Sequence, residues 1–350
     1  MSGHDIIVIG ASAGGVEALI YLVKNLPSDL KATVAIVLHI PSHGMSVLPH
    51  ILQRAGNLPA VHANDREAIL PGRIYIAPPD YHLLIKQGYF RLTRGPRENN
   101  HRPAIDPLFR SAARVYGQRV IGVILTGVLD DGTAGLQAVK IRKGIAVVQD
   151  PEDAMYSGMP RSAIENVDNI DHVLPLSDIP AMLVNLVNTP IAVENNNPVP
   201  RNLEFESDVA EVDMAAINDD NKPGNPSPFA CPDCGGTLWD LSQGDVLRFR
   251  CRTGHAFSAE TLLAKQSDAL EDALWIALRA LEEKASLSRR MANRMRDRNQ
   301  SLTAQRFDSD AQDALARASV IRDVLLTGNG SITQIDENIP PVVKDEDITR

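Results

Sequence analysis

The first half of the chain alternates short apolar runs with stretches whose apolar residues recur every three or four positions. The apolar runs are rich in β-branched residues, as buried strands are, and the stretches between them have helical spacing. The strand-like runs include IIVIGA, TVAIVLHI, RVIGVILTG and IAVVQD. This alternation predicts an α/β domain with a doubly wound, mostly parallel sheet and helices on both faces.

The pattern also predicts individual helices and a hairpin within this domain. Helices are predicted over GGVEALIYLVKNLP, ending near Pro27, and over residues 45–54. The segment YHLLIKQGYFRLTRG predicts a β-hairpin that turns at Gln87 and Gly88. We expect this α/β domain to span residues 1–188.

The composition changes after this domain. Residues 189–228 are rich in proline, asparagine and acidic residues and keep neither period, which predicts a disordered acidic linker. An irregular ordered loop packed on the first domain is the alternative. The rest of the chain divides into a cysteine-containing segment at 229–257, a helical segment at 258–326 and an acidic tail at 327–350 that we expect to be disordered.

The helical segment contains two amphipathic stretches. On the first, one face carries Leu263, Leu270, Leu274, Ala277 and Leu281. On the second, the corresponding face carries Phe307, Ala311, Ala314, Ala318, Ile321 and Leu325. The pattern predicts a C-terminal helical hairpin, and a dimer through these helices is the alternative.

Composition narrows the class of protein. The net charge is -9 and 44% of the residues are hydrophobic, which argues for a globular protein without a nucleic-acid partner. No apolar run approaches the roughly 20 residues that span a bilayer, so we expect no direct membrane insertion. The N-terminus lacks the basic and apolar segments of a secretion signal. We therefore expect a cytoplasmic protein.

All cysteines of the chain fall in one segment, and a histidine follows the last of them. The residues are Cys231, Cys234, Cys251 and His255, in the pattern C-x2-C, a 16-residue gap, then C-x3-H. This is zinc-ribbon spacing, with a hairpin predicted to turn at Gln243 and Gly244. Four protein ligands leave no open position, so we expect a structural zinc in a Cys3His site. Thiols without a metal are the alternative.

The stretch GASAGG after the first strand begins like a dinucleotide-binding loop, but Ser12 stands at the position of its second glycine. Such a loop also needs an acidic residue at the end of the second strand, and that strand ends at His39 instead. The same residues satisfy G-x-S-x-G, in which a serine is presented on a tight turn between a strand and a helix. A serine here could also simply cap the helix.

Three predicted strand ends now carry Ser12, His39 and the pair Asp130 and Asp131. A serine nucleophile needs a base, and the base needs an orienting carboxylate, which these residue types supply. The residues alone do not decide between the two aspartates. Nor do they exclude the rival bases His43, His50, His62 and His82.

Six motifs occur in order along the chain: IGASAGG, LHIPSH, IYIAPPDYHLLI, HRPAIDPLFRSAA, LTGVLDDGTAGL and VVQDPEDAMYSGMP. Over about residues 3–185 the sequence thereby resembles the catalytic domain of the chemotaxis protein-glutamate methylesterases (CheB type). The resemblance implies a doubly wound α/β domain that hydrolyses glutamyl methyl esters, and deamidates certain glutamines, with no cofactor for catalysis. The implied partner is a methylated chemoreceptor or a similar signalling protein.

Carried over motif by motif, the resemblance implies Ser12 as nucleophile, His39 as base and Asp131 as the orienting acid. We expect the backbone amides near Ala13 and Val128 to stabilise the oxyanion. Where the family has Gly-Met-Gly ahead of the acid, this chain has Gly-Val-Leu, which departs from the family pattern in the oxyanion loop.

The chain begins at the first strand, without the phosphorylatable receiver domain of the well-known chemotaxis enzymes, so we expect no phosphorylation control in cis. Its ribbon and helices resemble a C-terminal extension of some receiver-less family members. This extension could dock a partner or control access to Ser12. The alternative to an esterase is a catalytically vestigial signalling scaffold that binds partners through the ribbon and the helical tail.

Overall fold

The computed structural model describes residues 3–41, 44, 46–191, 198–218, 223–242 and 246–327. The chain forms two compact units, Met1–Ala264 and Lys265–Arg350. The first unit holds the α/β domain together with the cysteine-containing sheet, and the second holds most of a long helical hairpin.

A seven-stranded parallel sheet with the order β3-β4-β2-β1-β7-β8-β9 forms the centre of the first unit. Its strands are β1 (Ile6–Ala11), β2 (Thr33–Leu38), β3 (Ala60–His62), β4 (Ile74–Ile76), β7 (Val120–Ile124), β8 (Ile145–Gln149) and β9 (His172–Leu174). β1 and β2 are buried along their whole length, which explains why they read as continuous apolar runs. The predicted doubly wound α/β fold is confirmed.

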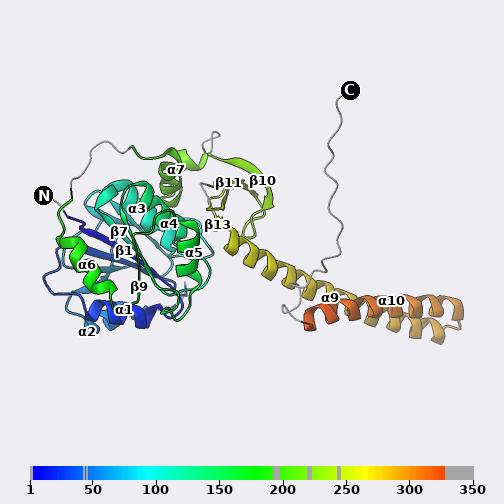
Figure 1. The fold of residues 1–350 in the computed structure, drawn as a ribbon. Coiled ribbons are helices and arrows are strands. Elements are labelled where there is room, and N and C mark those ends of the chain that lie inside the picture. The colour runs from blue at the N-terminus through cyan, green and yellow to red at the C-terminus, as the bar shows by residue number, and fades with distance from the viewer. Residues whose placement is uncertain are drawn as a thin grey trace, which may run out of the picture. The chain divides into compact units, whose positions relative to one another are not determined.

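Helices cover both faces of this sheet (Figure 1). One face packs against α1 (Gly15–Lys24), α2 (Leu48–Ala55) and α6 (Ile179–Asn188); the other packs against α3 (Ile105–Tyr116), α4 (Thr133–Ile141) and α5 (Gly158–Asn166). A short 3-10 helix, η1 (Gly117–Arg119), follows α3. The predicted hairpin is present as β5 (His82–Lys86) and β6 (Tyr89–Thr93), which turn at Gln87 and Gly88.

The prediction of a disordered linker is wrong for the residues that form α7 (Arg201–Ala210) and α8 (Met214–Asn218). Leu203 joins the core beside α3, and Thr93 Oγ donates a hydrogen bond of 2.8 Å to the Ala210 carbonyl. Arg114 of α3 forms an ion pair of 2.5 Å with Asp208. Asp208, one of the acidic residues that made this segment look unstructured, is therefore paired with a cation of the domain on which the segment packs.

The cysteine-containing sheet has four antiparallel strands in the order β10-β11-β12-β13, and we call it the ribbon. Its strands are β10 (Asn225–Ala230), β11 (Thr237–Asp240), β12 (Arg248–Cys251) and β13 (Ala256–Ser258). It therefore begins a few residues before the predicted boundary. The predicted turn at Gln243 and Gly244 lies outside the described residues, although β11 and β12 on either side of it pair as a hairpin would.

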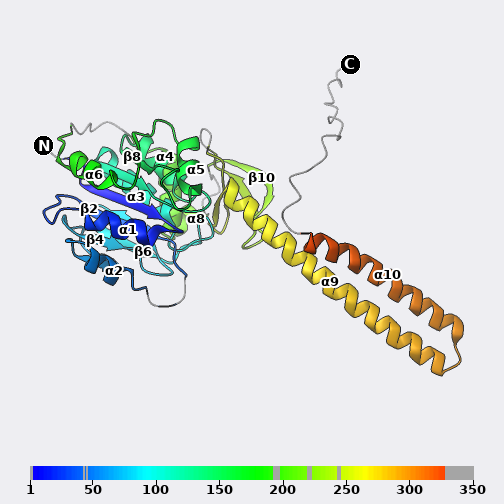
Figure 2. The ribbon, with the colours of Figure 1, turned by 60° about the horizontal axis from the view of Figure 1, so that its bottom comes forward.

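The C-terminal helices are α9 (Ala259–Asp297) and α10 (Ser301–Leu326), which run side by side in Figures 1 and 2. Ion pairs Arg296–Asp308 and Arg322–Glu282 show that they are antiparallel. Small buried residues line the contact: Ala285, Ala292, Ala304, Ala311, Ala314 and Ala318.

The sequence predicts a buried apolar face along the whole of α9, and this prediction is wrong at the start of the helix. Leu263 and Leu270 are 66% and 59% exposed. The reason is length: the 26 residues of α10 extend along only the later part of the 39-residue α9. The predicted tail lies almost wholly outside the described residues. Among the helices that are described, none has the length and apolar character needed to cross a membrane.

Leu203→Ala should lower the free energy of unfolding by about 2–3 kcal/mol, because the side chain is 6% exposed and its removal leaves a cavity under α7. Glu204→Ala, an exposed position in the same helix, is the matched control and should change it by less than about 0.5 kcal/mol. Urea unfolding followed by circular dichroism measures both. Equal values for the two variants would contradict the docking of α7.

Candidate active site

Ser12 lies in the turn between β1 and α1. Its amide donates a hydrogen bond of 3.0 Å to the Thr126 carbonyl, and its own carbonyl accepts one of 2.9 Å from Gly15. Gly14 has a φ of 73°, in the left-handed region that favours glycine. The glycine-rich sequence thus permits the tight turn that presents the serine above the carboxyl edge of the sheet.

His39 follows the end of β2, the neighbour of β1, and its side chain is only 6% exposed. Nδ1 of its ring is 3.1 Å from Ser12 Oγ, and Nε2 is 2.7 Å from Asp131 Oδ2. With the proton on Nε2 donated to the carboxylate, Nδ1 presents its lone pair to the serine hydroxyl. The three side chains therefore form one hydrogen-bonded row.

Asp131 is buried and accepts four hydrogen bonds. Besides His39, the amides of Ile105 and Asp106 in the first turn of α3 donate to it at 2.7 and 3.3 Å. The amide group of Asn99 donates the fourth, at 2.8 Å. The carboxylate thereby caps α3, whose own N-cap, an alanine, has no side-chain acceptor.

The surroundings of Asp131 keep it ionised. Burial alone raises the pKa of this carboxyl, but the hydrogen bond and charge of His39 and the donated amide bond of Ile105 lower it to about 2. The neighbouring Asp106 behaves in the opposite way, because burial and the charge of Asp131 raise its pKa to about 7. Of these two buried carboxyl groups, the one facing His39 is therefore the more acidic.

His101 stacks on His39, with ring centroids 3.6 Å apart and planes inclined by 4°. Its Nδ1 is 2.5 Å from the Asn99 carbonyl, to which it donates a hydrogen bond. Burial and the nearby His39 lower the pKa of His101 to about 4. A neutral ring consequently covers one face of the His39 imidazole and limits its rotation.

The other acid and bases that the sequence left open are not seen in this row. The side chain of Asp130 accepts hydrogen bonds from Ser258 and Thr261 rather than from a histidine. His62 and His82 are hydrogen-bonded to backbone groups, and His50 lies exposed on α2. His43 falls outside the described residues.

The segment after β7 approaches Ser12 closely at Gly127. A Cβ at Gly127 would lie 2.9 Å from the Ser12 Cβ, so only glycine permits this approach. Leu129 has a φ of 59°, in the left-handed region, at the last position of the Gly-Val-Leu departure noted in the sequence. Among the described residues, the amides of Ala13 and Val128 donate to no other group.

A groove of about 350 Å³ opens beside the row. Its lining is His39, Ile40, Pro41, Arg97, Asn100, His101 and Arg102. Two arginines thus line the same groove as the imidazole, and Arg102 is paired with Asp80. The groove is large enough for an extended carboxyl-derived side chain.

The ribbon holds a second constellation, and its ligand atoms all lie within 4.8 Å of one another: Cys231, Cys234, Cys251 and His255. The sulfurs of Cys234 and Cys251 are 3.6 Å apart, and His255 Nδ1 is 3.6 Å from Cys251 Sγ and 3.8 Å from Cys231 Sγ. Four ligands around a tetrahedral zinc are separated by about 3.5–3.8 Å, given the usual zinc–sulfur and zinc–nitrogen bond lengths. The four residues therefore fit a metal ion and are too far apart for a disulfide.

Sequence reasoning assigned no role to Asn99, His101 or Ser258, which contact the row directly or through one residue. His101 stands in the motif HRPAIDPLFRSAA, so the resemblance contained a signal for it. Asn99 and Ser258 are far apart in sequence, and neither has a local pattern that indicates its partner.

A parallel sheet whose strand ends bring a serine, a histidine and an aspartate into one row has the architecture of a serine hydrolase. The model of the CheB methylesterase family matches residues 7–183, just over half of the 350-residue chain, and the chain belongs to this family. The ribbon and the C-terminal helices lie outside the matched residues.

Known proteins agree with this assignment. A Leptospira interrogans protein, provisionally named protein-glutamate methylesterase/protein-glutamine glutaminase, is 42% identical over 184 residues, which are 52% of this chain and 95% of that protein. A Thermotoga maritima protein-glutamate methylesterase/protein-glutamine glutaminase is 39% identical over 52% of this chain and 54% of its own length. The crystal structure of the Thermotoga maritima CheB methylesterase catalytic domain matches with a TM-score of 0.51 and 39% identity, over 53% of this chain and 100% of that one.

His101→Phe should reduce the loss of stability between pH 7 and pH 4. The lowered pKa of His101 means that the unfolded chain binds a proton at a higher pH than the folded protein does. The contribution of the neutral His101 ring to the free energy of unfolding is therefore complete above about pH 6.5 and is lost as the pH falls toward 4. The wild type should lose up to about 3 kcal/mol more than the variant over this range, as measured by urea unfolding. The same pH dependence in both proteins would contradict the buried, neutral ring.

Proposed function

We propose that this protein hydrolyses the methyl ester of glutamyl side chains on a chemoreceptor or a related signalling protein, with Ser12 as the nucleophile. The observation that carries the proposal is the buried row Ser12–His39–Asp131, with separations of 3.1 and 2.7 Å. Membership of the CheB methylesterase family and the names of the relatives supply the reaction and the substrate class.

In the first step His39 accepts the Ser12 proton while Oγ bonds to the ester carbonyl carbon. Asp131 holds the imidazole in the required tautomer and stabilises the positive charge that develops on it. The free amides of Ala13 and Val128 are our candidates for the oxyanion donors, and one such donor contributes about 3–4 kcal/mol in the transition state.

In the second step the bond between the carbonyl carbon and the methoxy oxygen breaks, and His39 returns the proton to release methanol. Water, activated by His39, then attacks the glutamyl ester on Ser12 and frees the carboxylate. Each step uses only residues of this chain.

The same row suits deamidation of a glutamine, the second activity in the names of the relatives. The attacked carbonyl is then an amide, and the leaving group is ammonia, which departs only after it takes the proton from His39. The acyl-enzyme and its hydrolysis are unchanged. We include this reaction in the proposal because the chemistry differs only in the leaving group.

We also propose that the four ribbon ligands hold one structural zinc ion. Three thiolates and an imidazole at the separations of a tetrahedral site support zinc, and they leave no coordination position for a substrate. The ion would stabilise the small ribbon, whose apolar core is only a few residues.

Ser12→Ala should reduce methanol release from a methylated receptor at least about 1,000-fold, because the nucleophile is lost while substrate binding is kept. Ser177→Ala, which changes an exposed serine on the surface, is the control and should leave the rate unchanged. Unchanged methanol release by the Ser12 variant would contradict the proposed function.

Metal analysis of the purified protein should find about one equivalent of zinc, and Cys234→Ala should lose it, because one of the four ligands is removed. Thr253→Ala is the matched control: its hydroxyl lies 3.7 Å from Cys234 Sγ but is not a ligand, and the zinc should remain. Wild-type protein that is folded in the ribbon and free of metal would contradict the site.

A further inference from the structure

The loop at residues 97–101 lies between the row and the ribbon, and its backbone pairs with β13. The Asn99 amide donates a hydrogen bond of 2.8 Å to the Ala256 carbonyl, and the Ala256 amide donates one of 3.3 Å to the Arg97 carbonyl. Glu98 and Ala256 thereby form a parallel bridge. The loop is in effect a short additional strand on the edge of the ribbon.

The side chain of Asn99 connects the ribbon to the row. Its Nδ2 donates to Asp131 at 2.8 Å and to Asp106 at 3.1 Å, and its Oδ1 accepts a hydrogen bond of 2.9 Å from the Ser258 amide at the end of β13. The residue is 3% exposed. Both hydrogens of the amide are therefore committed to carboxylates, and its oxygen is held by the ribbon.

The same loop carries His101, the ring that stacks on His39. Because His101 Nδ1 donates to the Asn99 carbonyl, the position of this ring depends on the backbone that pairs with Ala256. One five-residue loop thus contacts two members of the row, the imidazole and the carboxylate.

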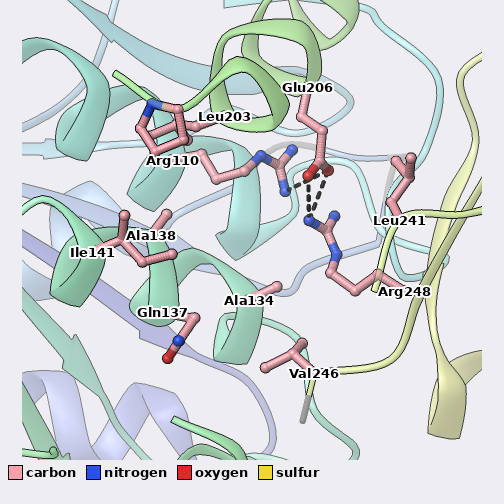
Figure 3. Close-up of a pocket in the computed structure, with 11 residues that line it drawn as sticks. Arg110, Ala134, Gln137, Ala138, Ile141, Leu203, Glu206, Leu241, Val246 and Arg248 are labelled. Atoms are coloured by element: carbon pink, nitrogen blue, oxygen red, sulfur yellow. Dashed lines mark hydrogen bonds and ion pairs between the residues drawn. The ribbon is translucent and has the colours of Figure 1, made fainter. Parts of the chain in front are cut away.

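A buried ion network fixes the ribbon to the domain. Arg250 of β12 donates to Glu98 at 2.9 Å and to Glu206 of α7 at 3.1 Å. Figure 3 shows Arg110 of α3 and Arg248 of β12 converging on Glu206. The cavity beside Arg110, Glu206 and Arg248 has a volume of only about 30 Å³.

The metal ligands bracket the residues that make these contacts. Cys251 directly follows Arg250, and His255 directly precedes Ala256. The Cys251 amide also donates a hydrogen bond of 2.9 Å to the His255 carbonyl, closing the turn between β12 and β13. The conformation of this turn therefore sets where Arg250 and Ala256 meet the loop.

We propose that the ribbon is a positioning element of the active site, and that Asn99 is the positioning residue through which it acts on Asp131 and His39. The proposal rests on the proposed function. A ribbon with its turn intact holds the row ready for attack, and loss of the turn releases the loop and slows the attack by Ser12.

The experiment measures labelling by a fluorophosphonate, in which Ser12 Oγ bonds to phosphorus and fluoride leaves. Asn99→Gly deletes the amide but keeps the left-handed backbone, since the φ of Asn99 is 47°. Cys234→Ser perturbs the ribbon from its exposed ligand. Each variant should lower the labelling rate constant at saturating probe at least tenfold, with the half-saturating concentration changed less than twofold. The double variant should be no more than about threefold slower than the slower single variant, because both changes break the same connection.

Thr261→Val is the matched control, because it removes a buried hydrogen bond from the Thr261 hydroxyl to Asp130 without touching Asn99 or the row. Its labelling rate constant should stay within twofold of the wild-type value. Should Asn99→Gly fail to fold, as judged by thermal melting, Asn99→Ser takes its place, because a hydroxyl is too short to join Asp131 to Ser258. A wild-type rate in either the Asn99 or the Cys234 variant, or multiplied effects in the double variant, would overturn the proposal. Wild-type protein that takes no label at Ser12 contradicts the proposed function itself, and this inference falls with it.

Discussion

A single carboxylate, that of Asp131, meets donors from three separate parts of the chain: the end of β2, the first turn of α3 and the loop at residues 97–101. A charge that is buried without partners is costly, so these segments must converge for the domain to close. The N-terminus of α3 is suited to this role because its free amides and its dipole both favour an anion. The same convergence orients the His39 ring, which then faces Ser12. Folding and the alignment of the proposed catalytic row therefore depend on the same interaction.

The ribbon is joined to this centre by polar groups more than by apolar packing. Glu98 and Glu206 are buried between arginines of α3 and β12, and the surrounding arginines lower the pKa of both carboxyl groups despite burial. Buried ion pairs add little net stability when their desolvation is counted, but they demand one geometry. A contact of this kind can hold the loop at residues 97–101 in a single position, which a flat apolar surface would not ensure.

The chain consists of a part that matches the family and of segments that follow this part. The family match covers residues 7–183 and includes the whole row, whereas α7, the ribbon and the C-terminal helices lie beyond it. Asn99 stands inside the matched region but receives a hydrogen bond from the Ser258 amide outside it. The proposed catalytic row thus belongs to the shared domain, and the contact that restrains Asn99 belongs to the segment that follows.

The sequence by itself determined the elements and the residue types: continuous apolar runs specify buried parallel strands, glycines on both sides of Ser12 specify a tight turn, and the cysteine spacing specifies a cluster of candidate metal ligands. These signals are local, because each depends on neighbours within a few residues. The residues alone left Asp130 and Asp131 open, the family resemblance pointed to Asp131, and the structure places Asp131 against His39. Only the tertiary structure decided that α7 folds onto the domain instead of forming a loose linker, and that Asn99 meets Ser258 across 159 positions of the chain. Such contacts follow from how whole elements pack, and no local pattern encodes them.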